Sequence, residues 1–229
     1  MLDNGYILKI SSLKSGKMSM KSKSKKEKSI LVADYNKNFI WLELPRNRGF
    51  TSFHANGIVA ILDKFNRLGA KRVVFYICGP GGDFFAFLKV AQKITSFLGI
   101  KVVFVPFGFV KSGCFWLTQV GSSCLVLPGT RLAFHHTVDI PVSGKSIERS
   151  MSQQDYFERM SRLMRIDAIQ LMYFTRRGKP ISKVFNLFDK KAVLTPKEAI
   201  RLGLCEKYYS KNLFEKHKHF VDVGINNAR

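Results

Sequence analysis

Strand-like and helix-like segments alternate along the middle of this 229-residue chain, and this order most constrains its fold. Short β-branched and aromatic runs are typical of buried strands, whereas apolar residues at helical spacing are typical of amphipathic helices. The expected strands are 39–44, 72–77, 102–106, 124–127 and 131–134, and the expected helices are 53–68, 84–98, 112–120 and 146–174. The alternation predicts an α/β fold in which helical layers cover a parallel sheet.

The two ends of the chain differ in composition from its middle. Residues 1–29 hold eight lysines among serines and methionines, so we expect a basic arm without fixed structure. One folded domain is expected over 30–210, followed by a basic tail over 211–229. A capping signature at 195–198 predicts the start of a further helix within that domain.

The net charge of +22 limits the classes of partner. Such a charge attracts acidic partners, including nucleic acid, anionic membranes and acidic proteins. A solvated basic surface without a dedicated ligand is an equally good explanation. Because no RNA-recognition signature or zinc finger is present, a nucleic-acid partner is not the favoured one.

Cysteine usage and hydropathy predict an intracellular protein. The four cysteines stand far apart, which is typical of reduced thiols in a core, so the cytoplasm or an organelle stroma or matrix is expected. No secretory signal is apparent, and the longest apolar run, 94–110, is too interrupted to be a transmembrane segment. His217 and His219 have no partner ligands nearby in sequence, so a metal site is not expected there.

Three chemical parts stand in order at the ends of the expected strands. Gly82 belongs to a glycine turn after strand 72–77, Ser112 opens a helix after strand 102–106, and His135 follows strand 131–134. A serine nucleophile, a histidine base and backbone N–H donors for an oxyanion are what acyl transfer requires. The combination therefore predicts an acyl-transfer site, with the N–H of Gly113 beside that of Gly82.

Each part also has a plainer explanation. The glycines could form an ordinary tight turn, Ser112 could be a helix N-cap, and His135 could be a core or surface histidine. The order of the three parts favours a site over these separate explanations.

Four ordered motifs over 39–209 resemble the proteolytic subunit of the Clp protease, in the Clp-protease/crotonase superfamily. Gly-Pro-Gly-Gly at 79–82 resembles the family's Ser-Pro-Gly-Gly, and Lys-Ser-Gly-Cys at 111–114 stands where the family has Ala-Ser-Met-Gly. The run 127–135 closely resembles Leu-Pro-Asn-Ser-Arg-Val-Met-Ile-His. The run 194–204 resembles Met-Ser-Ala-Glu-Glu-Ala followed by Tyr-Gly-Leu.

The resemblance implies a Ser-His-Asp peptidase built as a spiral of β-β-α units with a protruding long helix. It implies Ser112 as nucleophile, His135 as general base, and the N–H groups of Gly82 and Gly113 as the oxyanion hole. The implied substrate is an unfolded polypeptide, and no cofactor is implied. The resemblance also implies a homo- or hetero-oligomeric ring, formed through the long helix 146–174 and fed by an ATP-driven unfoldase.

The position of the family aspartate departs from the family pattern, because it is Lys191 here. Asp189 is the nearest carboxylate and is predicted to take the aspartate's role, with Asp139 as the next candidate. A lysine near the histidine would disfavour the imidazolium formed during attack. The alternative function is therefore a catalytically inactive ring subunit or binding scaffold. A crotonase is less favoured, because acyl-CoA chemistry needs no serine–histidine pair.

Overall fold

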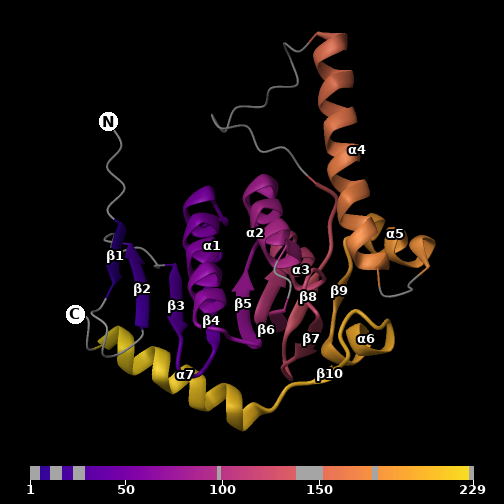
Figure 1. Cartoon of the computed structure of the whole chain (residues 1–229). Helices are drawn as coiled ribbons and strands as arrows, with labels where there is room; N and C mark the ends of the chain where they lie inside the picture. The colour runs from indigo at the N-terminus through magenta and orange to yellow at the C-terminus, as the bar shows by residue number, and fades with distance from the viewer. Residues whose placement is uncertain are drawn as a thin grey trace. The chain divides into compact units, whose positions relative to one another are not determined.

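The computed structural model describes residues 6–10, 17–22, 29–96, 99–137, 152–176 and 180–226. The chain divides into two compact units, one formed by 1–133 with 193–229 and the other by 134–192. Strands and helices alternate through the first unit, which confirms the predicted α/β fold (Figure 1).

A mixed sheet forms the first unit, with strand order β1-β2-β3-β4-β5-β6-β7-β10, and β8 pairs with β6 and with β9. The strands are β1 (Tyr6–Ile10), β2 (Lys17–Ser22), β3 (Ile30–Asp34), β4 (Phe39–Glu43), β5 (Arg72–Gly79), β6 (Lys101–Lys111), β7 (Ser123–Val126), β8 (Arg131–Ala133), β9 (Val193–Leu194) and β10 (Lys207–Tyr208). The run from β4 to β7 is parallel, as predicted. Strand β8 also pairs in parallel with β6, and β10 pairs in parallel with β7. The pairs β1–β2, β2–β3, β3–β4 and β8–β9 are antiparallel.

Both faces of the central strands are buried, so these strands are apolar throughout. Phe75 stacks on Phe104 with ring centroids 5.0 Å apart. The next residue, Tyr76, points to the other face because side chains alternate along a strand, and there it packs on Trp41. In Figure 1, α1 (Ser52–Arg67) and α2 (Phe84–Ser96) lie side by side along the sheet, and each buries an apolar stripe.

The helix α7 (Lys211–Asn226) covers the face that carries Trp41 and Tyr76. Its Phe214 stacks on Trp41 at 5.2 Å, and its His217 accepts or donates a 2.8 Å hydrogen bond with the Tyr76 hydroxyl. The expectation of a basic tail over 211–229 is therefore wrong for residues 211–226. The remaining helices of this unit are the short α3 (Gly113–Thr118) and α6 (Pro196–Arg201).

Strands β1 and β2 correct the expectation that residues 1–29 lack fixed structure. They form a hairpin in which β2 pairs antiparallel with β3. The sequence pattern missed β2 because its lysines and serines cannot build a core, and it missed β1 because that mostly apolar run of five residues stands alone in a basic arm. What orders a strand at such a position is pairing with the otherwise unpaired backbone groups of β3.

The second unit is built on α4 (Gln153–Thr175) and α5 (Ile181–Asp189). Phe134, Phe174 and Phe188 pack their rings together with centroids 5.0–5.6 Å apart. The long helix predicted over 146–174 is thus observed from Gln153, and its predicted start lies outside the described residues. α5 was not predicted.

Candidate functional site

The glycine turn after β5 is held tightly against the segment before α1. Phe50 donates its N–H to the Gly81 carbonyl at 2.7 Å and accepts the Asp83 N–H at 2.9 Å. Gly82 has φ +148°, and a Cβ there would lie 2.2 Å from the Phe50 nitrogen. Only glycine allows the two backbone segments to lie this close, so the fold specifies the conformation of the turn.

Ser112 stands directly against this turn in an unusual backbone conformation. It links β6 to α3 with φ +55° and ψ −132°, and its N–H donates to the Ala133 carbonyl at 3.2 Å. A Cβ on Gly81 would lie 2.6 Å from the Ser112 Cβ. Positive φ at a non-glycine residue costs on the order of 1–3 kcal/mol and persists where the surroundings enforce it. The structure thus brings the predicted nucleophile and the glycine turn together.

The Ser112 hydroxyl forms no cap hydrogen bond with α3, so the N-cap explanation fails. The next residue, Gly113, is buried, and a Cβ there would lie 2.3 Å from the Phe87 ring. Cys114 is also buried, and burial raises the pKa of its thiol far above the ordinary range. Burial therefore makes the Cys114 thiol an inert core group rather than a nucleophile.

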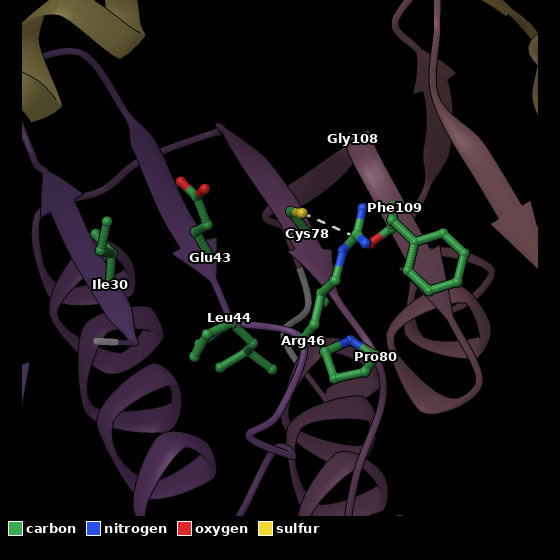
Figure 2. A pocket seen from close by; sticks show the side chains of 10 residues that line it. Ile30, Glu43, Leu44, Arg46, Cys78, Pro80, Gly108 and Phe109 are labelled. Atoms are coloured by element: carbon green, nitrogen blue, oxygen red, sulfur yellow. Dashed lines mark hydrogen bonds between the residues drawn. The ribbon is translucent and has the colours of Figure 1, made fainter. Parts of the chain in front are cut away.

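A pocket of about 540 Å³ opens beside the start of the same turn (Figure 2). Glu43 and Arg46 bring charges of both signs to it, and Cys78 donates from its thiol to the Phe109 carbonyl at 3.5 Å. Burial raises the pKa of Cys78, so this thiol is not activated. Gly79 and Pro80 also line the pocket, but the predicted site residues do not.

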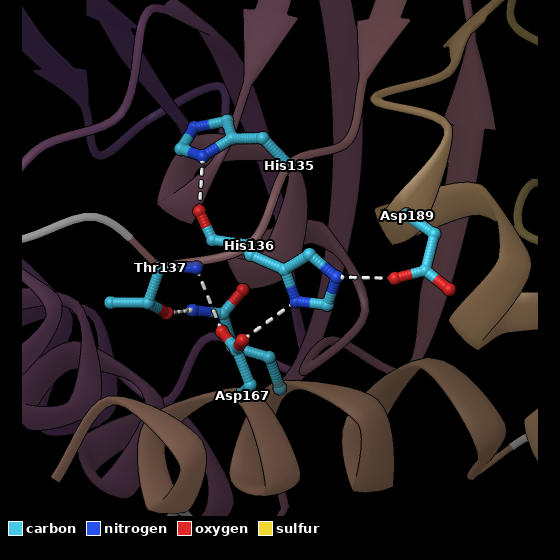
Figure 3. Close-up of polar contacts among 6 residues, drawn as sticks. His135, His136, Thr137, Asp167 and Asp189 are labelled. Atoms are coloured by element: carbon cyan, nitrogen blue, oxygen red, sulfur yellow. Dashed lines mark hydrogen bonds and ion pairs between the residues drawn. The ribbon is translucent and has the colours of Figure 1, made fainter. Parts of the chain in front are cut away.

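The second unit holds a histidine between two carboxylates. His136 contacts Asp167 of α4 through Nδ1 and Asp189 of α5 through Nε2, each at 2.8 Å (Figure 3). Burial acts to lower the pKa of His136, but the hydrogen bonds and charges of Asp189 and Asp167 outweigh it and leave this pKa raised. The pair of contacts is the arrangement expected of an imidazolium, since both ring nitrogens then donate.

His135, the predicted base, has a different environment from its neighbour. Its ring points away from the two carboxylates in Figure 3, and its Nδ1 lies 2.5 Å from the backbone carbonyl of His136. Asp189, predicted to orient His135, is seen here on His136 instead. The two adjacent rings therefore have different partners: Asp167 and Asp189 meet His136, whereas the His136 carbonyl meets His135.

The remaining candidates divide between exposed and undescribed positions. Lys191, at the place of the family aspartate, is exposed and has φ +47°. Asp139 lies outside the described residues. No local pattern singles out Asp167, because its contact with His136 depends on how α4 packs. His217 near the C-terminus packs on Phe39 and bonds to Tyr76.

The described part of the chain contains no cluster of three or more histidine, cysteine or acidic side chains arranged to hold a metal ion. None of its described helices combines the length and the apolar character that crossing a membrane requires. Cys114, Cys124 and Cys205 are buried and Cys78 is partly buried, as expected for core thiols.

A family model described as Clp protease matches residues 36–212, which include both the glycine turn with Ser112 and the histidine pair. A search of curated proteins finds no match to the chain.

Proposed function

Because the chain belongs to the Clp protease family, we propose that it cleaves unfolded polypeptides or peptides as a serine endopeptidase. The observation that carries this proposal is the backbone of Ser112, held at positive φ against a glycine turn, with a hydroxyl that does not cap the helix after it. A plain loop serine needs none of these features.

In the proposed reaction, the Ser112 hydroxyl oxygen attacks the carbonyl carbon of the scissile peptide bond, and Nε2 of His135 takes the hydroxyl proton. The N–H groups of Gly82 and Gly113 stabilise the negative charge on the carbonyl oxygen. The C–N bond then breaks, and His135 returns the proton to the leaving amine. Water hydrolyses the acyl-enzyme by the same steps, so no cofactor is consumed.

We further propose that subunits assemble into a homo- or hetero-oligomeric ring served by an ATP-driven unfoldase, and that this ring acts in the cytoplasm or an organelle stroma or matrix. Support for assembly comes from α4, whose described part exposes large apolar side chains: Tyr156, Phe157, Met160, Met164 and Met172. Apolar stripes of this kind mark interaction surfaces.

A second candidate function is a catalytically inactive ring subunit. It is favoured by Lys191 at the aspartate position and by the contact of Asp189 with His136 in place of His135. The two candidates share a fold and an assembly, so only chemistry at Ser112 separates them.

The deciding experiment is labelling with a fluorophosphonate probe, together with hydrolysis of a fluorogenic peptide. Ser112→Ala should abolish labelling and lower hydrolysis by about a million-fold, the loss typical of a triad nucleophile. The matched control is Ser96→Ala, at an exposed serine near the end of α2, which should leave both unchanged. A wild-type protein that neither takes up the probe nor hydrolyses peptide would favour the inactive subunit.

A further inference from the structure

The tautomer of His135 follows from what its ring touches. A backbone carbonyl only accepts hydrogen bonds, so the contact between His135 Nδ1 and the His136 carbonyl requires a proton on Nδ1. In the neutral ring, the lone pair then resides on Nε2. This is the tautomer that a general base of a serine peptidase needs, and in such enzymes a carboxylate normally fixes it.

The carbonyl that fixes this tautomer is itself held from both sides. The His136 side chain is bound by Asp167 and Asp189, as described above. The next amide, that of Thr137, donates to the other oxygen of Asp167 at 2.8 Å, and Gln170 donates to the Thr137 hydroxyl at 3.0 Å. Because the peptide group between His136 and Thr137 carries the carbonyl, these contacts fix where that oxygen points (Figure 3).

We propose that the main-chain carbonyl of His136 replaces the missing aspartate as the group that orients His135, and that His136, Asp167 and Asp189 are positioning residues for it. The proposal rests on the proposed function for its catalytic meaning, but its geometry lies wholly within the 134–192 unit. Asp189 then acts on His135 only through His136.

The same arrangement supplies charge. An imidazolium at His136 with two carboxylates leaves one net negative charge next to His135 in the chain. This charge favours the imidazolium that His135 becomes during attack. The groups that face His136 are Asp167 from α4, Asp189 from α5 and the rings of Phe185 and Phe188.

The sign of the pH effect follows from the raised pKa of His136. Because the pKa of His136 is raised, its contacts with both Asp167 and Asp189 are fully formed below the ordinary histidine pKa of about 6.5. They are lost as pH rises through the raised pKa of His136. His135, in contrast, must be neutral to accept a proton. Activity is therefore expected to fall as pH rises through the raised pKa of His136, because the neutral ring donates to only one of the two carboxylates and no longer holds the carbonyl from both sides.

The first test needs no activity. In histidine-labelled full-length protein, nitrogen NMR reports the protonation of each ring, with His135→Gln and His136→Gln used to assign the signals. We expect neutral His135 to carry its proton on Nδ1 and His136 to titrate above the ordinary value. A proton on Nε2 of neutral His135 would overturn the proposal.

The second test separates direct from indirect action of Asp189. Asp189→Asn should lower the pKa of His136 and leave neutral His135 with its proton on Nδ1, because the His136 carbonyl and the contact of the Thr137 N–H with Asp167 remain. Turnover should fall on the order of ten-fold, the loss typical of an outer-shell partner. If Asp189 orients His135 directly, this variant should lose the Nδ1 tautomer of His135 and turnover should fall by about ten-thousand-fold, and the proposal is wrong.

A matched pair of variants tests His136 itself. Arginine keeps a permanent charge and donates to both carboxylates, so His136→Arg should retain the His135 tautomer and lose the alkaline fall in activity. His136→Phe should lose the tautomer preference. If His136→Arg and His136→Phe show the same His135 tautomer and the same pH profile of activity, the His136 side chain does not position His135. If His135 has the expected tautomer but the fluorophosphonate probe does not label Ser112, the proposed function is refuted and the positioning of His135 by the His136 carbonyl is not.

Discussion

At the scale of single residues, Gly81 sets how closely the glycine turn approaches Ser112. In Gly81→Ala, the new methyl group would meet the Ser112 Cβ at 2.6 Å, so one of the two segments must move. We expect Ser112 to lose its probe reactivity and the free energy of unfolding to fall by about 1–3 kcal/mol, the usual cost of overpacking. Labelling rates and urea unfolding measure both effects.

The control for this change is Gly129→Ala. Gly129 also has a positive φ, +79°, but no atom lies within 4 Å of its added Cβ. It therefore carries the backbone strain without the collision. Loss of Ser112 reactivity in both variants would show that strain, rather than contact with the turn, is responsible.

Residues of the candidate site differ in how far the sequence predicts them. Ser112 and the glycines were predicted because each directly follows a strand-like run, where local pattern fixes position. The contacts of His136 were not predicted, because Asp167 and Asp189 reach it from 31 and 53 residues away. Which of two adjacent histidines meets them depends on the packing of α4 and α5, which no local pattern encodes.

At the scale of elements, α7 offers a direct test of packing. Phe214 is buried on the sheet, whereas its neighbour Leu213 is 40% exposed. Phe214→Ala should lower the free energy of unfolding by about 3–5 kcal/mol, and Leu213→Ala should cost much less. Equal shifts in the urea midpoint would mean that α7 does not pack on the sheet through Phe214.

The start of α1 carries a pH-dependent contact. Nδ1 of buried His54 accepts the Thr51 N–H at 3.1 Å, and burial, aided by the charge of Arg48, lowers the pKa of His54 to about 4. The neutral ring is therefore favoured in the folded state, so stability present above pH 6.5 is lost as pH falls toward 4. We expect wild type to lose roughly 2 kcal/mol more than His54→Gln between pH 7 and pH 5, measured by urea unfolding.

The helices and strands, like the site residues, were predicted where their own local pattern specifies them and missed where they depend on distant partners. Strands β4 to β7 and helices α1 and α2 were predicted, because their own apolar spacing specifies them. α7 was missed, since Phe214, His217 and Val221 lie at helical spacing among charged residues and gain meaning only against the sheet. Strand β2 depends on pairing with β3, and β1 depends on pairing with β2, so neither is specified by its own local pattern.

At the scale of the whole molecule, α4 is the element expected to join subunits. Phe157 and Met164 are 63% and 67% exposed, a cost that burial between subunits would remove. Phe157→Glu with Met164→Glu should convert the ring to smaller species in light scattering. Ser161→Glu adds charge to α4 at an exposed polar position and should leave the mass unchanged. A wild-type monomer would exclude the ring.

The packing of α7 on the sheet has a consequence for the synthesis of the protein. Trp41 and Tyr76 are made early, but the helix that covers them spans residues 211–226. Their face of the sheet therefore remains uncovered while about 150 further residues are translated, which takes roughly 8–30 seconds at 5–20 residues per second. Holding chaperones that bind apolar surface have this interval in which to act, and the core closes only after residue 226 has emerged.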